Sequence, residues 1–219
     1  MRLLDELRRD ADAHRDASLI NGLRPDCYPA RVELAMRHGH SYLLDAFKQL
    51  DVIRPDSLQR FHIPNVGMVD GLRLAETFID YCVRPIGARE YIHRLQALVT
   101  WAAPSPLSVH LESPEAVCRA RIALEQRDIR HELSDAGAPI NGTRLLVIPR
   151  RVVTDISIYA DHDNGTLEVR ARNLFGFSDD AFSMPADPLS DLSFERLVHA
   201  ILGRRSAQEA LRPSLRLVG

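Results

Sequence analysis

Residues 154–175, TDISIYADHDNGTLEVRARNLF, constrain the fold more than any other segment of this chain. Apolar and polar residues alternate on both sides of Asn164-Gly165. This dipeptide is the strongest short-range signal for a two-residue β-hairpin turn, because both of its residues tolerate a positive φ. A two-residue turn aligns the strands as Asp163–Thr166, Asp161–Glu168, Tyr159–Arg170 and Ser157–Arg172. The segment therefore predicts a pair of antiparallel strands.

The alternation also predicts what each face of this hairpin carries, because successive side chains of a strand point to opposite faces. One face holds the apolar residues Ile156, Ile158, Ala160, Leu167, Val169 and Ala171. The other face holds Asp155, Ser157, Tyr159, Asp161, Glu168, Arg170 and Arg172. We expect a half-buried antiparallel sheet whose outer face is solvated and strongly charged.

Composition places the chain among ordinary globular proteins. Of its 219 residues, 45% are hydrophobic and 26% are charged, and the formal net charge is -2. A chain with this balance has no overall positive field that would draw it to nucleic acid or to an acidic membrane. Lys48 is the only lysine beside many arginines. We interpret this as the coding bias of a GC-rich bacterial genome.

The cysteines and the N-terminus indicate a compartment. Cys27, Cys82 and Cys118 are odd in number and widely spaced, which matches neither a disulfide framework nor a zinc site. The first residues are charged and lack the apolar stretch of a secretory signal. No apolar run approaches the roughly 20 residues of a membrane-spanning helix. These features predict a cytoplasmic protein that does not bind membranes.

Residues 1–103 are predicted to form a helical region. Apolar residues recur at helical spacing in segments 3–17, 29–50, 72–83 and 91–102. Gly39 lies inside the second segment and would allow two helices in place of one. Arg54-Pro55 is expected to end that helix, and the punctuation Ala103 to Pro106 marks the best domain boundary.

Residues 107–219 are predicted to form an α/β region. A strand at 108–111 precedes a helix that begins at Ser113-Pro114, and further strands follow at 129–133 and 145–148. After the hairpin at 154–175, a closing helix spans 193–203, capped by Ser193, ended at Gly203 and lying on the apolar sheet face. The fold class is α+β, with the N-terminal helical region packed on a mostly antiparallel C-terminal region.

Asp161 and Glu168 are the candidate metal ligands. The expected alignment puts their side chains on one face with Cβ atoms roughly 5 Å apart. Two carboxylates at that distance would hold a divalent metal or share a proton. With Arg170 to stabilise an anion, the pair suggests a metal-dependent hydrolase acting on nucleic acid. The alternative is a solvated face on which the arginines offset the acids, and then no cofactor is expected.

Four arginines are the candidate binding residues: Arg150, Arg151, Arg170 and Arg172. If they share one side of the molecule, they form a patch for an anion or for nucleic acid. The chain carries no G-x-G-x-x-G, H-E-x-x-H or G-x-S-x-G motif. We therefore favour a non-enzymatic protein that binds a macromolecule, most simply a protein partner, as a regulator or as a subunit of an assembly. The hydrolase and a nucleic-acid-binding protein without catalysis remain the two alternatives.

Overall fold

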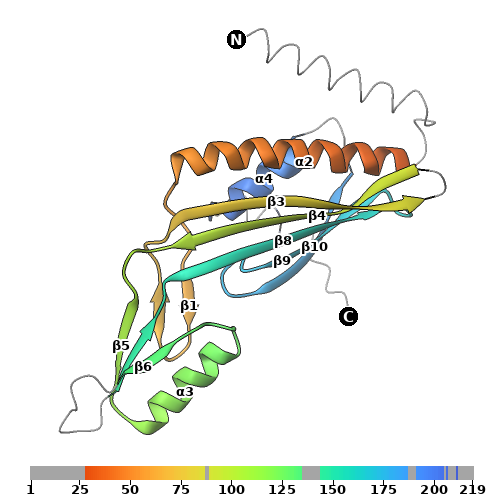
Figure 1. Ribbon diagram of the computed structural model, residues 1–219. Helices are drawn as coiled ribbons and strands as arrows, with labels where there is room; N and C mark the ends of the chain where they lie inside the picture. The colour runs from red at the N-terminus through yellow and green to blue at the C-terminus, as the bar shows by residue number, and fades with distance from the viewer. Residues whose placement is uncertain are drawn as a thin grey trace.

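A long helix on a five-stranded sheet dominates the fold (Figure 1). The computed structural model describes residues 28–86, 89–134, 144–186, 191–204, 206 and 211. Helix α2 (Tyr28–Ile53) contacts strands of the sheet and helix α4 (Leu192–Ile201). The strands follow the order β10-β9-β8-β4-β3, and every neighbouring pair is antiparallel. Their bounds are β3 (Arg73–Ile86), β4 (Arg89–Ala102), β8 (Arg151–Asp161), β9 (Thr166–Arg172) and β10 (Asp179–Pro185). The α+β class with mostly antiparallel sheets is confirmed.

The helices expected at 72–83 and 91–102 are wrong, because these segments form β3 and β4. Strand β4 lies inside the sheet and has apolar residues on both faces, so its run fits a helical spacing as well as a strand. Leu95, Ala97, Val99 and Trp101 are buried on one face, and Leu98 lies on the other. The period of two was present in the sequence, but Leu98 and Ala102 masked it.

Helix α2 runs without a break through Gly39. A Cβ at this position would lie 2.2 Å from Cζ of Phe194 in α4, so only glycine allows the Phe194 ring to pack here. The helix ends before Arg54, whose φ is 47°, and Pro55, as the sequence predicts. Packing, and not a helix break, explains the glycine.

The N-cap of helix α4 lies two residues before the expected one. Asp191, and not Ser193, occupies the N-cap position, and its side chain makes no capping hydrogen bond. Gly203, with a φ of 81°, follows the helix end as predicted. The apolar stripe of the helix is buried: Phe194, Leu197, Val198, Ala200 and Ile201.

A three-stranded sheet and helix α3 follow β4. Strands β5 (Leu107–Leu111) and β6 (Glu132–Ser134) both pair antiparallel with β7 (Arg144–Ile148), which lies between them. Helix α3 (Pro114–Glu125) starts at the predicted cap, where the Ala116 N–H donates to Oγ of Ser113 at 3.1 Å. The strand expected at 129–133 is found slightly later, as β6. A short hairpin, β1 (Phe61–Ile63) and β2 (Gly67–Val69), completes the described strands.

One apolar core joins these parts. Strand β4 precedes the boundary expected at 103–106 and β8 follows it, yet the two are neighbours in one sheet. Buried residues of the large sheet, such as Trp101, belong to the same cluster as Leu124 of α3 and Leu146 of β7. The helix expected at 3–17 lies outside the described residues. No helix in the described part of the chain has both the length and the apolar character needed to cross a membrane.

Candidate functional site

The turn of the 154–175 hairpin differs from the expected one. The loop comprises four residues, 162–165, and the strands align as Asp161–Thr166, Tyr159–Glu168, Ser157–Arg170 and Asp155–Arg172. The expected alignment is therefore wrong by two residues. The cause is the Asp161 carboxylate, which accepts hydrogen bonds from the Asp163 N–H at 3.2 Å, the Asn164 N–H at 3.0 Å and the Asn164 side-chain amide at 2.7 Å.

This shift separates the candidate metal ligands. Glu168 lies opposite Tyr159, and Asp161 lies opposite Thr166. The side-chain hydrogen bond from Asn164 is the main reason that the pKa of Asp161 is lowered, so its carboxylate is engaged in the turn. Among the described residues, no group of three or more His, Cys, Asp or Glu side chains is placed to hold a metal ion. A metal at Asp161 and Glu168 stays a prediction.

A shift by an even number of residues leaves each side chain on its expected face. Ile156, Ile158, Leu167 and Val169 are buried on the helix side of the sheet. The opposite side, which we call the open face, carries the charged residues in cross-strand rows. One row is Cys82, Arg94, Tyr159, Glu168 and Ser183; the next is Asp80, Gln96, Ser157, Arg170 and Ala181; the third is Phe78, Leu98, Asp155, Arg172 and Asp179.

Tyr159 is at the centre of the most structured part of this face. The Arg170 guanidinium lies 5.2 Å from the centre of the Tyr159 ring, a cation–π contact. The His93 ring meets it edge-on at 6.0 Å. A side-chain hydrogen bond with Tyr159 is the largest cause that raises the pKa of Arg94. His93 has no partner in β3 because β4 bulges there, and this irregularity brings two consecutive side chains to Tyr159.

A hollow of about 560 Å³ lies beside Tyr159. Arg84, His93, Asp161, His162, Asp163, Glu168 and Arg170 are among its lining residues. A second hollow of about 330 Å³ shares Arg170 and is also lined by Asp155, Arg172 and Asp179. Both hollows carry side chains of both charge signs, so the open face offers paired opposite charges to a ligand.

Three of the four predicted binding arginines share the open face. Arg151, Arg170 and Arg172 occupy positions of the same parity as its rows. None of the three forms an ion pair with a carboxylate of a described residue. Arg150 points elsewhere: it donates to the Ser105 carbonyl at 2.8 Å and to the Ser105 hydroxyl at 2.6 Å. These bonds connect the segment between β7 and β8, which carries Arg150, to the segment between β4 and β5, which carries Ser105.

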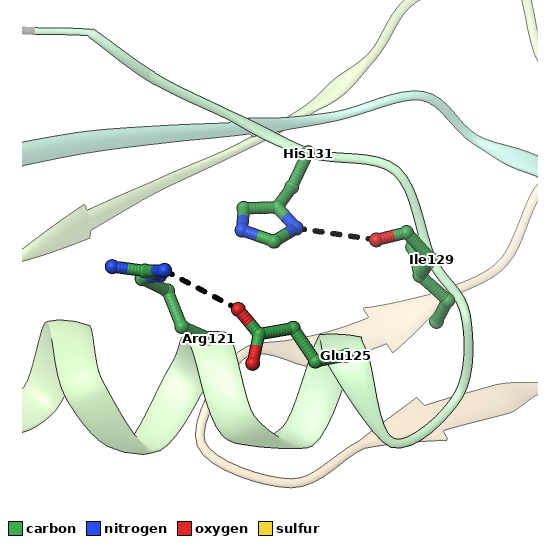
Figure 2. Close-up of polar contacts among 4 residues, drawn as sticks. All are labelled: Arg121, Glu125, Ile129 and His131. Carbon is green, nitrogen blue, oxygen red and sulfur yellow. Dashed lines mark hydrogen bonds and ion pairs between the residues drawn. The ribbon is translucent and has the colours of Figure 1, made fainter.

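The arginines of α3 differ from those of the open face. In Figure 2, Arg121 and Glu125 lie along one side of α3 and form an ion pair at 3.3 Å. The His131 ring lies above them, with Nδ1 3.2 Å from the Ile129 carbonyl oxygen. Here the charge of Arg121 is offset within its own helix, so this surface is a weaker candidate for binding.

A buried polar cluster lies behind the site, and no sequence pattern predicted it. Glu33 of α2 is only 4% exposed; its carboxylate accepts the Ile92 N–H at 2.7 Å and lies 2.6 Å from Nε of Arg37. That N–H follows the β4 bulge and would otherwise be unpaired. Burial lowers the pKa of the neighbouring His162, while Glu33 opposes the shift. The Glu33 carboxylate thus joins α2 to β4 at the bulge.

Comparison with known proteins adds no relative. No protein family matches the chain, and no curated protein or solved structure matches it significantly. The function has to be argued from the site itself.

Proposed function

We propose that the protein is a non-enzymatic bacterial cytoplasmic protein that binds a protein partner on the open face. One observation carries the proposal. The five-stranded sheet packs helices on one face, and no described helix covers the other face, although it spans five strands. An antiparallel sheet tolerates water on one side, but a face of this size, whose arginines form no ion pair with described carboxylates, is suited to recognition.

The charge pattern supports a protein partner. Arg151, Arg170 and Arg172 alternate with Asp155, Glu168 and Asp179 over the same strands. Nucleic acid would meet repulsion from the acids, whereas a protein surface can offer both signs. The exposed apolar groups, such as Phe78 at 51% exposure, add area that a protein partner would bury.

Charge reversal tests the proposal. In a pull-down from lysate of the source cells, the Arg170→Glu/Arg172→Glu variant is expected to lose a partner that the unaltered protein retains. The matched control is Arg119→Glu/Arg196→Glu, which reverses two exposed arginines on α3 and α4. Equal retention by both variants would count against the open face. A photo-crosslinking residue at Ser157, in the centre of the face, identifies the partner directly.

A second candidate is nucleic-acid binding without catalysis. It is favoured by the grouping of Arg94, Arg151, Arg170 and Arg172 on one face without ion pairs to described carboxylates. It predicts affinity for a labelled oligonucleotide that falls steeply as salt rises. No change in fluorescence anisotropy at low salt would exclude this candidate and leave the protein partner as the better explanation.

A further inference from the structure

The edge strands of the five-stranded sheet, β3 and β10, differ in how accessible their outward backbone N–H and C=O groups are to another strand. In antiparallel pairs, alternate residues direct both N–H and C=O to the same neighbour. The Asn173 N–H bonds the Ser178 carbonyl at 2.8 Å, which places the even-numbered residues of β10 in the ladder with β9. Asp179, Ala181 and Ser183 therefore direct their backbone groups outward. The same alternation, followed strand by strand across the sheet, directs the backbone groups of Thr77, Ile79 and Tyr81 outward on β3.

The β3 edge is protected against another strand. Its outward Tyr81 N–H is already occupied by Oδ1 of Asp80 at 2.8 Å. Pro85 stands at an outward position and has no N–H to offer. Register shifts at Leu74/Glu76 and at Cys82/Val83 also disturb the pairing geometry of this strand. Charge, proline and bulges are the usual means by which proteins prevent pairing at an edge.

The β10 edge has no register shift, and its outward residues Asp179, Ala181 and Ser183 include one charged residue and no proline. Asp179, Ala181 and Ser183 are exposed, and no described residue pairs with this side of β10. Ala181 and Ser183 have small side chains that leave the edge accessible. Pro185 interrupts the outward groups only at the end of the strand. Phe182 and Met184, on the helix side, are buried, so the strand itself is firmly placed.

We infer that the outer edge of β10 pairs with an extended segment of a protein partner whose alternate residues are basic, acidic and basic. The inference rests on the proposed function and names how the partner is held. Main-chain hydrogen bonds to Asp179, Ala181 and Ser183 supply affinity, and the side chains on the open face supply selectivity. A basic-x-acidic-x-basic pattern is symmetric, so it fits either direction of the added strand.

The rows of the open face dictate this pattern. An added strand lies about 4.8 Å from β10 and about 9.6 Å from β9. Its residue opposite Asp179 contacts that carboxylate and is best basic. Its residue opposite Ala181 faces Arg170 across a small side chain and is best acidic. Its residue opposite Ser183 faces Glu168 in the same way and is best basic.

A second copy of this chain is a poorer occupant. Two β10 strands paired antiparallel about Ala181 would put Asp179 of each copy opposite Ser183 of the other. Each Asp179 would then face the Glu168 that lies behind that serine. Like charges at these positions oppose the pairing. A partner segment with basic residues there has the complementary charges.

Hydrogen exchange with defined peptides tests the inference on the unaltered protein. The probe is acetyl-Thr-Lys-Val-Glu-Val-Lys-Thr-amide, and its control is the charge-swapped acetyl-Thr-Glu-Val-Lys-Val-Glu-Thr-amide. We expect the first to bind roughly tenfold more tightly, since three cross-strand charge contacts change sign between them. We also expect exchange at the amides of Asp179, Ala181 and Ser183 to slow, with no change at Thr77 and Ile79. Equal affinity of the two peptides, or no slowing in β10, would overturn the inference.

Two variants separate this edge from the rest of the face. Ala181→Pro removes one outward N–H without breaking the ladder to β9, so it should abolish peptide binding while circular dichroism stays unchanged. Its matched control is Val83→Pro on β3, which should bind the peptide normally. Arg170→Glu reverses one of the three charge contacts, so it should reduce the preference for the first peptide without reversing it. A partner still crosslinked at Ser157 without protection of β10 would refute the edge pairing alone; loss of both signals would refute the proposed function as well.

Discussion

The two faces of the five-stranded sheet are built from alternate residues of the same strands, yet one packs against helices and the other is partly exposed. On β8, Val152, Thr154, Ile156 and Ile158 are buried on the helix side. The residues between them, such as Asp155, Ser157 and Tyr159, lie on the open face and are partly exposed. Because the side-chain period of a strand is two, the helix side can be optimised for packing without restricting the open face. Stability and recognition are therefore separable in this protein.

The treatment of charge shows the same difference. The buried carboxylate of Glu33 has both the Ile92 N–H and the Arg37 guanidinium beside it. Arg170 and Arg172 on the open face have no carboxylate partner among the described residues. A charge removed from water needs such partners, while a solvated charge does not. Substitutions on the two faces should therefore have very different effects on folding.

The largest effect is expected for Trp101→Ala. Trp101 is fully buried on the helix side, and its loss leaves a cavity that should lower the free energy of unfolding by about 3–5 kcal/mol. Leu98→Ala, on the open face of the same strand, is the control and should cost much less. Urea unfolding measures both. Similar losses would show that the open face is also part of a packed core.

Gly39→Ala comes next. Helix propensity alone predicts that this change stabilises α2 by about 1 kcal/mol. The contact with the Phe194 ring predicts the opposite sign, a loss of about 1–3 kcal/mol from overpacking. Ser41→Ala, exposed on the same helix, controls for propensity. A gain in stability for Gly39→Ala would disprove the packing between α2 and α4.

Asp161→Ala should cost about 1–2 kcal/mol, because the loop loses several hydrogen bonds to one carboxylate. Asp163→Ala in the same loop should change stability by less than about 0.5 kcal/mol. The pKa of Asp161 is lowered in the folded state, so its contribution is present above its ordinary value of 3.8 and is lost as pH falls through the folded pKa. Urea unfolding at pH 7 and at pH 3 checks both statements.

His162 should make the folded state sensitive to mild acid. Burial lowers its pKa below the ordinary value of 6.5, so the unfolded chain binds the proton more readily. Stability should therefore decline as pH falls from 6.5 towards the folded pKa. His162→Gln should reduce the difference between unfolding free energies at pH 7.5 and pH 5.5. An unchanged difference would show that the loop does not bury this ring.

The smallest effect on folding is expected for Arg170→Ser/Arg172→Ser. Both side chains are exposed and lack ion pairs with described carboxylates, so the unfolding free energy should change by less than about 0.5 kcal/mol for each substitution. Binding of the partner should nevertheless fall. Calorimetry and the pull-down together separate the two results. A large loss of stability would mean that the open face also supports the fold.

Local signals in the sequence predicted several features correctly. The cap at Ser113, the helix end at Arg54-Pro55 and the glycine after α4 depend on residues a few positions apart, and all are found in the structure. The faces predicted for the strand residues of the 154–175 hairpin, such as Ile156 and Arg170, are also found in the structure. The turn length was not, because the Asp161 side chain competes with the Asn164-Gly165 signal and draws the loop out to four residues.

The sequence by itself determined the alternation of apolar and charged residues and the positions of turns and caps, because these depend on neighbours in the chain. Only the tertiary structure decided that 73–86 and 89–102 are strands, since their apolar residues suit a helix or a strand until β8 and α2 bury them. It also decided that Gly39 serves Phe194 and that Arg151, Arg170 and Arg172 share one face. These features depend on strands and helices that are distant in sequence, so short-range sequence patterns do not predict them.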